Sequence, residues 1–83
     1  MRIFILDSQN VSKPIYIMES DTVLELKKQT KKAFNITGEI ELVYNGILLM
    51  DDDEQLLEKG IGEGATINYL GAFFSGFNKN IFY

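Results

Sequence analysis

The 83-residue chain contains no cysteine, no histidine and no tryptophan, and it has a single proline. Without cysteine it has no disulfide and no thiolate nucleophile, and without histidine it has no imidazole base or pH switch. Cys/His zinc sites are excluded for the same reason. The composition therefore argues against an enzyme and predicts no catalytic residue, no cofactor and no metal. A reducing compartment fits the lack of cysteine.

Long apolar runs and an excess of basic residues are also missing. No stretch reaches the roughly 18 apolar residues that span a bilayer, and Met1–Asp7 lacks the features of a signal peptide. Twelve acidic residues against eight basic ones give a net charge of −4, which argues against nucleic-acid binding. We therefore expect a cytoplasmic or nuclear protein that binds neither nucleic acid nor membrane.

The first half of the chain reads as a hairpin followed by a helix. Ile3 and Ile5 alternate within a first strand over 1–6, and a polar turn leads to a second strand that starts after Pro14. Next, residues 22–25 (Thr-Val-Leu-Glu) fit a capping box, and an apolar stripe with helical spacing continues to residue 34. Asn35 and Gly38 supply stop signals.

The second half returns to strand character. Residues 39–50 alternate around Asn45-Gly46, the dipeptide typical of type I′ hairpins, and a short helical turn and a last strand over 65–70 follow. This order predicts an α+β fold with one helix packed on a mixed five-stranded sheet. The acidic run 51–54 fails as an EF-hand, because Leu56 stands where that loop needs glycine, so a solvated loop is favoured. Four lysines of the helix either face an acidic partner or line a solvated surface.

An ordered set of short matches makes the chain resemble ubiquitin over residues 1–70. The matches are Met1-Arg2-Ile3-Phe4-Ile5, Glu19-Ser20-Asp21-Thr22-Val23, Leu26-Lys27, Leu42-Val43-Tyr44-Asn45-Gly46, Leu49, Asp52, Leu56, Ile61 and Gly64-Ala65-Thr66-Ile67. The resemblance implies a ubiquitin-like β-grasp fold. It also implies a set of core positions, namely Ile3, Ile5, Ile15, Ile17, Val23, Leu26, Leu42, Leu49, Leu56, Ile61, Ile67 and Tyr69.

The resemblance further implies a role as a protein-interaction module. Ubiquitin-like domains are commonly bound noncovalently on the open face of their sheet, and Val43, Asn68 and Leu70 match positions on that face. The implied partners are other proteins, with ubiquitin-pathway or proteasome-related receptors among them. The plainer alternative for Val43 is an ordinary exposed strand residue, which needs no function.

The face departs from the family pattern in three ways. One patch member is missing in the first turn, where Ser8 and Gln9 stand, and Glu41 replaces a family arginine. Ile47 replaces a lysine and extends the apolar area. We therefore expect weak binding, or none, to the usual ubiquitin receptors.

The tail over 71–83 lacks the terminal Gly-Gly of ubiquitin. Gly76 falls at the joining position and seven residues follow it, so a covalent modifier processed after Gly76 and conjugated to target lysines is the alternative function. Five of the ten aromatic residues lie in the last eleven positions. The tail folds back on the sheet face, adheres to a partner or to a second copy in a weak homodimer, or has no role.

Overall fold

The computed structural model of the protein describes residues 1–70, so Gly76 and the tail fall outside the described residues. The elements follow one another as the strands β1 (Arg2–Leu6) and β2 (Ser12–Tyr16), the helix α1 (Val23–Phe34), the strands β3 (Glu41–Tyr44) and β4 (Ile47–Leu48), the 3-10 turn η1 (Leu56–Lys59) and the strand β5 (Thr66–Leu70). This arrangement confirms the predicted α+β fold.

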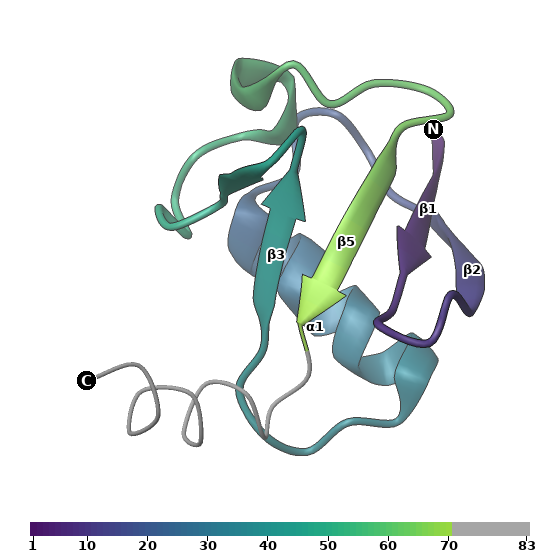
Figure 1. Cartoon of the computed structure of the whole chain (residues 1–83). Coiled ribbons are helices and arrows are strands. Elements are labelled where there is room, and N and C mark those ends of the chain that lie inside the picture. Colours follow the sequence, from purple (N-terminus) through teal and green to yellow (C-terminus); the bar gives the residue numbers. More distant parts are fainter. Residues whose placement is uncertain (71–83) are drawn as a thin grey trace.

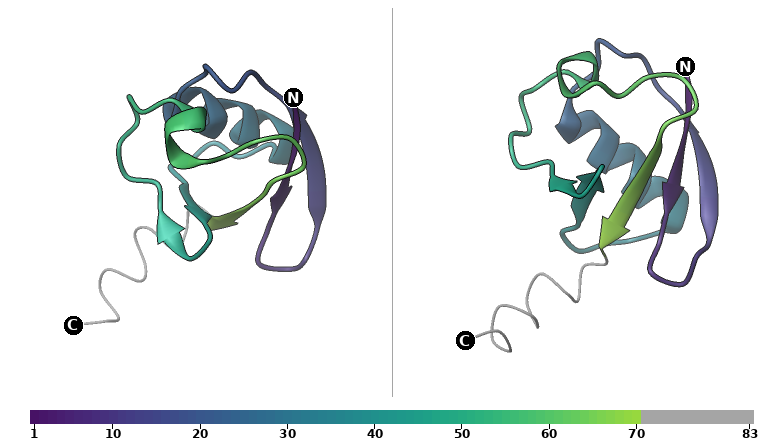
Figure 2. Two further views of the ribbon diagram at one scale, coloured as in Figure 1. Left: turned by 90° about the horizontal axis from the view of Figure 1, so that it is seen from above. Right: turned by 45° about the horizontal axis from the view of Figure 1, so that its top comes forward.

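The five strands form one mixed sheet in the order β2-β1-β5-β3-β4. Its central strand is β5, which pairs in parallel with β1 and antiparallel with β3. The outer pairs, β1 with β2 and β3 with β4, are antiparallel. Figure 1 shows β5 between β1 and β3, with α1 crossing behind the sheet, and Figure 2 shows sheet and helix as two layers. The two outermost strands, β2 and β4, each have a free edge within residues 1–70.

The core lies between helix and sheet. Eleven of the twelve expected core positions are buried, and Ile40 joins them. The exception is Tyr69, which is half-buried at the rim of the core with its ring centroid 5.1 Å from that of Phe34. The prediction for Tyr69 was therefore wrong in degree, because its ring packs beside Phe34 at the end of α1 and stays only partly covered.

The helix begins as its capping residue predicts. Thr22 is the N-cap, and its hydroxyl accepts the N–H of Glu25 at 3.2 Å. The reciprocal half of the predicted capping box is not formed within residues 1–70, where the Glu25 carboxylate accepts from the side chain of Gln29 at 2.9 Å. Asn35 ends the helix with a left-handed φ of 57°.

The structure confirms the predicted turn at Asn45 and Gly46 and corrects the predicted position of Pro14. Asn45 and Gly46 both have positive φ, 53° and 77°, as the type I′ hairpin requires. Pro14, expected at the start of its strand, lies in the middle of β2. The position tolerates proline because the N–H of the opposite residue, Phe4, donates to the carbonyl of Ala65, just before β5, at 2.9 Å. The Phe4 N–H therefore points away from β2, and the Pro14 nitrogen faces the free edge.

Candidate protein-interaction face

The two faces of the sheet differ in whether the helix covers them. Along β1, Ile3 and Ile5 point into the core, so by the period of two in a strand Phe4 and Leu6 point to the opposite face. Helix α1 covers only the inner face (Figure 2), and no other element of residues 1–70 covers the outer one. We call this outer surface the open face.

One row of side chains crosses all five strands on the open face. The strand registers place Ser12 opposite Leu6, Leu6 beside Asn68, Asn68 opposite Val43, and Val43 opposite Leu48. Directly opposite side chains on one face lie about 4.5–5.5 Å apart at their β-carbons, so the row is continuous. It joins segments that are up to 62 residues apart in the sequence.

The exposed amide of Asn68 lies among four aliphatic side chains. Leu6 and Val43 flank it in the row, Leu48 follows Val43, and Leu70 stands two positions further along the same strand. We call these five residues the open-face patch. Leu48 and Leu70 are 38% and 39% exposed, and the other two aliphatic residues are half-buried. The patch offers apolar contact area around one group that both donates and accepts hydrogen bonds.

Charged groups stand at the ends of the open face. Glu41 lies opposite Leu70 in the register of β3 and β5, so a carboxylate borders the patch where the family has an arginine. At the other end, the Arg2 guanidinium lies 5.3 Å from the centroid of the Phe4 ring, within cation–π range. The rim beside the patch is therefore acidic on the β3 side.

Three of the four predicted contact residues come together and the fourth lies elsewhere. Val43, Asn68 and Leu70 are neighbours on the open face. Ile47 pairs with Tyr44, whose side chain points to the inner face of the sheet, opposite to that of Val43. Ile47 is 64% exposed at the edge of the sheet. The expected extension of the patch by Ile47 is replaced by Leu48. The two-residue turn at Asn45 and Gly46 already predicts this pairing from the sequence. It makes Tyr44 and Ile47 partners and thereby pairs Val43 with Leu48.

Leu6 was missed as a member of the patch. The family places an apolar residue in the first turn, where Ser8 and Gln9 are exposed in this chain. The apolar contribution comes from Leu6, one step back on the strand and next to Asn68. The alternation of Ile3 and Ile5 in the sequence could have predicted this, because it places Leu6 on the open face.

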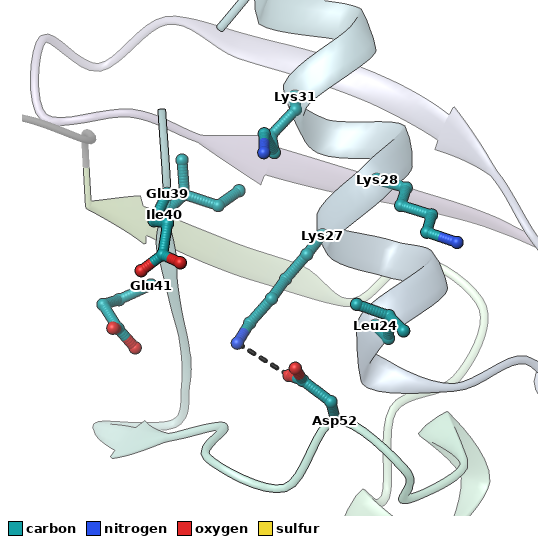
Figure 3. A pocket seen from close by; sticks show the side chains of 8 residues that line it. All are labelled: Leu24, Lys27, Lys28, Lys31, Glu39, Ile40, Glu41 and Asp52. Carbon is teal, nitrogen blue, oxygen red and sulfur yellow. Dashed lines mark hydrogen bonds and ion pairs between the residues drawn. The ribbon is translucent and has the colours of Figure 1, made fainter. Parts of the chain in front are cut away.

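A second surface lies beside the helix. Figure 3 shows a groove of about 310 Å³ between α1 and the start of β3, bridged at one end by the ion pair of Lys27 and Asp52 at 2.8 Å. Lys28 and Lys31 line one wall and Glu39 and Glu41 the other, so the groove presents both charges. The helix lysines thus form a mixed-charge surface in place of a uniform basic one.

Other kinds of site find little support in the described part of the chain. Within residues 1–70 no three acidic side chains are placed to hold a metal ion, and no helix there is long and apolar enough to cross a bilayer. Burial raises the pKa of the Tyr69 phenol above its ordinary value of 10.0, and the nearby Asp7 carboxylate adds to the rise. Tyr69 belongs to the inner side of the sheet, so this shift lies away from the open-face patch.

The model of the ubiquitin family matches residues 3–72, which is most of the chain. No curated protein matches it.

Proposed function

This chain belongs to the ubiquitin family, and from that premise we propose that it is a non-catalytic module that other proteins bind noncovalently on the open-face patch. The observation that carries the proposal is the continuous row across five strands, in which aliphatic side chains surround Asn68. Contiguous exposed apolar groups, unlike scattered ones, are typical of interaction sites.

The patch suits a small and reversible interface. Aliphatic side chains contribute contact area that favours association, and the Asn68 amide orients the partner through hydrogen bonds. A face of this size fits transient complexes, which bury up to about 1,200 Å² in total. Because Glu41 borders Leu70, the partner that fits best carries an apolar group for the patch and a basic group opposite Glu41.

Receptors of the ubiquitin pathway and of the proteasome are the partner class that family membership favours. The acidic rim and the exposed polar turn at Ser8 and Gln9 differ from the surface that such receptors bind on ubiquitin itself. We therefore propose that common ubiquitin-binding domains bind this chain more weakly than they bind ubiquitin. Affinities equal to those for ubiquitin would contradict this part of the proposal.

The test compares two leucines of nearly equal exposure on opposite layers. Leu70 is 39% exposed on the open face, and Leu24 is 40% exposed on α1. Leu70→Lys should weaken binding to a panel of ubiquitin-binding domains by about tenfold or more, since burial of one leucine contributes on the order of 1.5–3 kcal/mol. Leu24→Lys should leave the affinity unchanged. Equal effects of the two substitutions in NMR titrations of the labelled chain would refute the open face as the binding site.

The covalent alternative depends on Gly76, outside the described residues. If the chain is a modifier, incubation in a cell extract should remove the seven residues after Gly76 and produce heavier adducts. Intact mass spectrometry reads both, and Gly76→Ala should abolish them. An unchanged mass together with patch-dependent binding would favour the noncovalent function.

A further inference from the structure

The two free edges of the sheet differ in how they are protected. Edge strands expose unpaired N–H and C=O groups, and proteins usually block such edges with proline or with charge. On the β2 edge, Pro14 removes the outward donor and Lys13 places a charge within the strand. The segment over 44–50, which contains β4, has neither a proline nor a charged residue. The sheet is thus guarded on one side only.

The backbone of β4 presents its unpaired groups at Leu48. The N–H of Leu49 donates to the Leu42 carbonyl at 2.8 Å, so this pair is hydrogen-bonded. Hydrogen-bonded and non-bonded pairs alternate along an antiparallel ladder, which makes Val43 and Leu48 a non-bonded pair. The N–H and C=O of Leu48 therefore point away from β3, toward the free edge.

Exposed apolar side chains line this edge on both sides of the sheet. Ile47 is 64% exposed, Leu48 38% and Met50 77%. On the Ile47 side there is a depression of about 220 Å³, large enough for an apolar side chain, lined by Tyr44, Asn45, Ile47, Leu49, Glu58 and Lys59. An added strand sends alternate side chains to the two faces, so one would meet Leu48 and the next would meet this depression.

Two acidic side chains that form no ion pair within residues 1–70 lie directly beyond the edge. In the run over 51–54, Asp52 pairs with Lys27 at 2.8 Å and Glu54 with Lys59 at 3.0 Å. Asp51 and Asp53 are exposed, and no ion pair within residues 1–70 involves either of them. The Asp51 Oδ1 accepts the N–H of Asp53 at 3.0 Å. A strand that extends past β4 therefore reaches two carboxylates that no cation of residues 1–70 neutralises.

We propose that the β4 edge binds an extended segment of another protein by strand addition, with alternating apolar side chains and a lysine or arginine at the end beside Asp51 and Asp53. This site shares the Leu48 side chain with the open-face patch. It differs from the patch in the other groups it uses, which are the Leu48 backbone, the depression beside Ile47 and the acidic run. A second copy fits less well. Antiparallel pairing centred on Leu48 would put neutral Asn45 opposite Asp51, and parallel pairing would set the acidic runs side by side.

Selection from a random peptide library displayed on phage tests the proposal on the full chain. Enriched peptides should carry an apolar alternating run with lysine or arginine at one end. Leu48→Pro, which removes the outward N–H, should weaken binding of the most enriched peptide by about tenfold. Ser12→Pro on the β2 edge is the matched control and should have no effect.

Hydrogen exchange separates strand addition from other contacts. The Leu48 amide, which faces solvent in the free chain, should exchange many times more slowly when the selected peptide is bound. The double substitution Asp51→Lys and Asp53→Lys should also weaken binding. Glu19→Lys with Glu39→Lys, which alters two other exposed acids and the net charge equally, should not. These measurements stand even if Leu48→Pro prevents folding.

Three results would overturn the proposal. The first is enrichment of peptides without the basic end, or of none that depend on Leu48. The second is binding that shifts the open-face patch and leaves the Leu48 amide unprotected, which would assign the peptides to the proposed function. The third is protection of that amide in the chain alone, increasing with protein concentration, which would make the occupant a second copy.

Discussion

The hydroxyl of Thr30 offers the sharpest test of the energetics of this fold. Thr30 lies in the middle of α1 with 0% of its surface exposed, and its Oγ1 has no hydrogen-bond partner within residues 1–70. A buried hydroxyl without a partner costs about 1–3 kcal/mol relative to one that is hydrogen-bonded or hydrated. Valine has the same shape without the hydroxyl and a similar helix propensity. Thr30→Val should therefore stabilise the protein by about 1–2 kcal/mol.

Thermal and urea unfolding measure this effect. For a domain of this size, 1 kcal/mol shifts Tm by about 4–8 °C, so the variant should melt roughly 5–15 °C higher. In urea the midpoint should rise while the slope m stays unchanged, because the surface exposed on unfolding is nearly the same. A change in m would point to an altered unfolded or native state.

Thr22 provides the matched control, since the same substitution removes a hydroxyl that has a partner. Its Oγ1 accepts the Glu25 N–H at the N-cap, and loss of such a cap costs about 0.5–2 kcal/mol. Thr22→Val should therefore destabilise the protein while Thr30→Val stabilises it. The reasoning fails if both variants lose stability by similar amounts, since the Thr30 hydroxyl would then be satisfied in solution.

Two further predictions concern a turn and a titration. Gly46→Ala should lower the free energy of unfolding by about 1–2 kcal/mol, because the backbone φ of +77° is unfavourable for alanine even though no atom lies near the new methyl. Gly62→Ala is equally open and lies outside the left-handed region, so it should raise the free energy of unfolding by about 0.4–1 kcal/mol. Equal effects in chemical unfolding would contradict this account. Because the folded pKa of Tyr69 is raised, the stability linked to it is complete below pH 10 and is lost as pH rises through the folded pKa. Asp7→Asn removes the negative charge and keeps the oxygen that accepts the N–H groups of Gln9 and Val11. It should lower the Tyr69 pKa measured by NMR but leave it above 10.0, because burial still raises it. An unchanged pKa would show that the carboxylate has no part in the shift.

The inner side of the fold could be predicted from sequence because burial imposes a strong pattern. Strand alternation and the helical stripe identified the core, and the Asn-Gly turn and the Thr22 cap were found from local chemistry. The misses have physical reasons. Pro14 is tolerated within β2 because its nitrogen faces a free edge, which depends on the pairing of β1 with β5. Local sequence contains no information on that pairing.

The open face was less predictable because exposure allows many residue types. Family resemblance gave Val43, Asn68 and Leu70, yet the positions that complete the patch, Leu6 and Leu48, depend on register. A shift of one residue moves a side chain to the other face, and this separates Leu48 from Ile47. The difference between the two sheet edges likewise needed the strand order.

The pairing of β1 with β5 has a consequence for biosynthesis. The middle of the sheet is made by the strands at the two ends of residues 1–70, so neither β1 nor β3 has its inner neighbour until β5 is available. A nascent chain therefore has no stable sheet to assemble while residues 66–70 remain inside the ribosome. Long-range pairing of this kind slows folding and exposes unpaired edges in the meantime. We expect the whole module to fold in a single late step during translation.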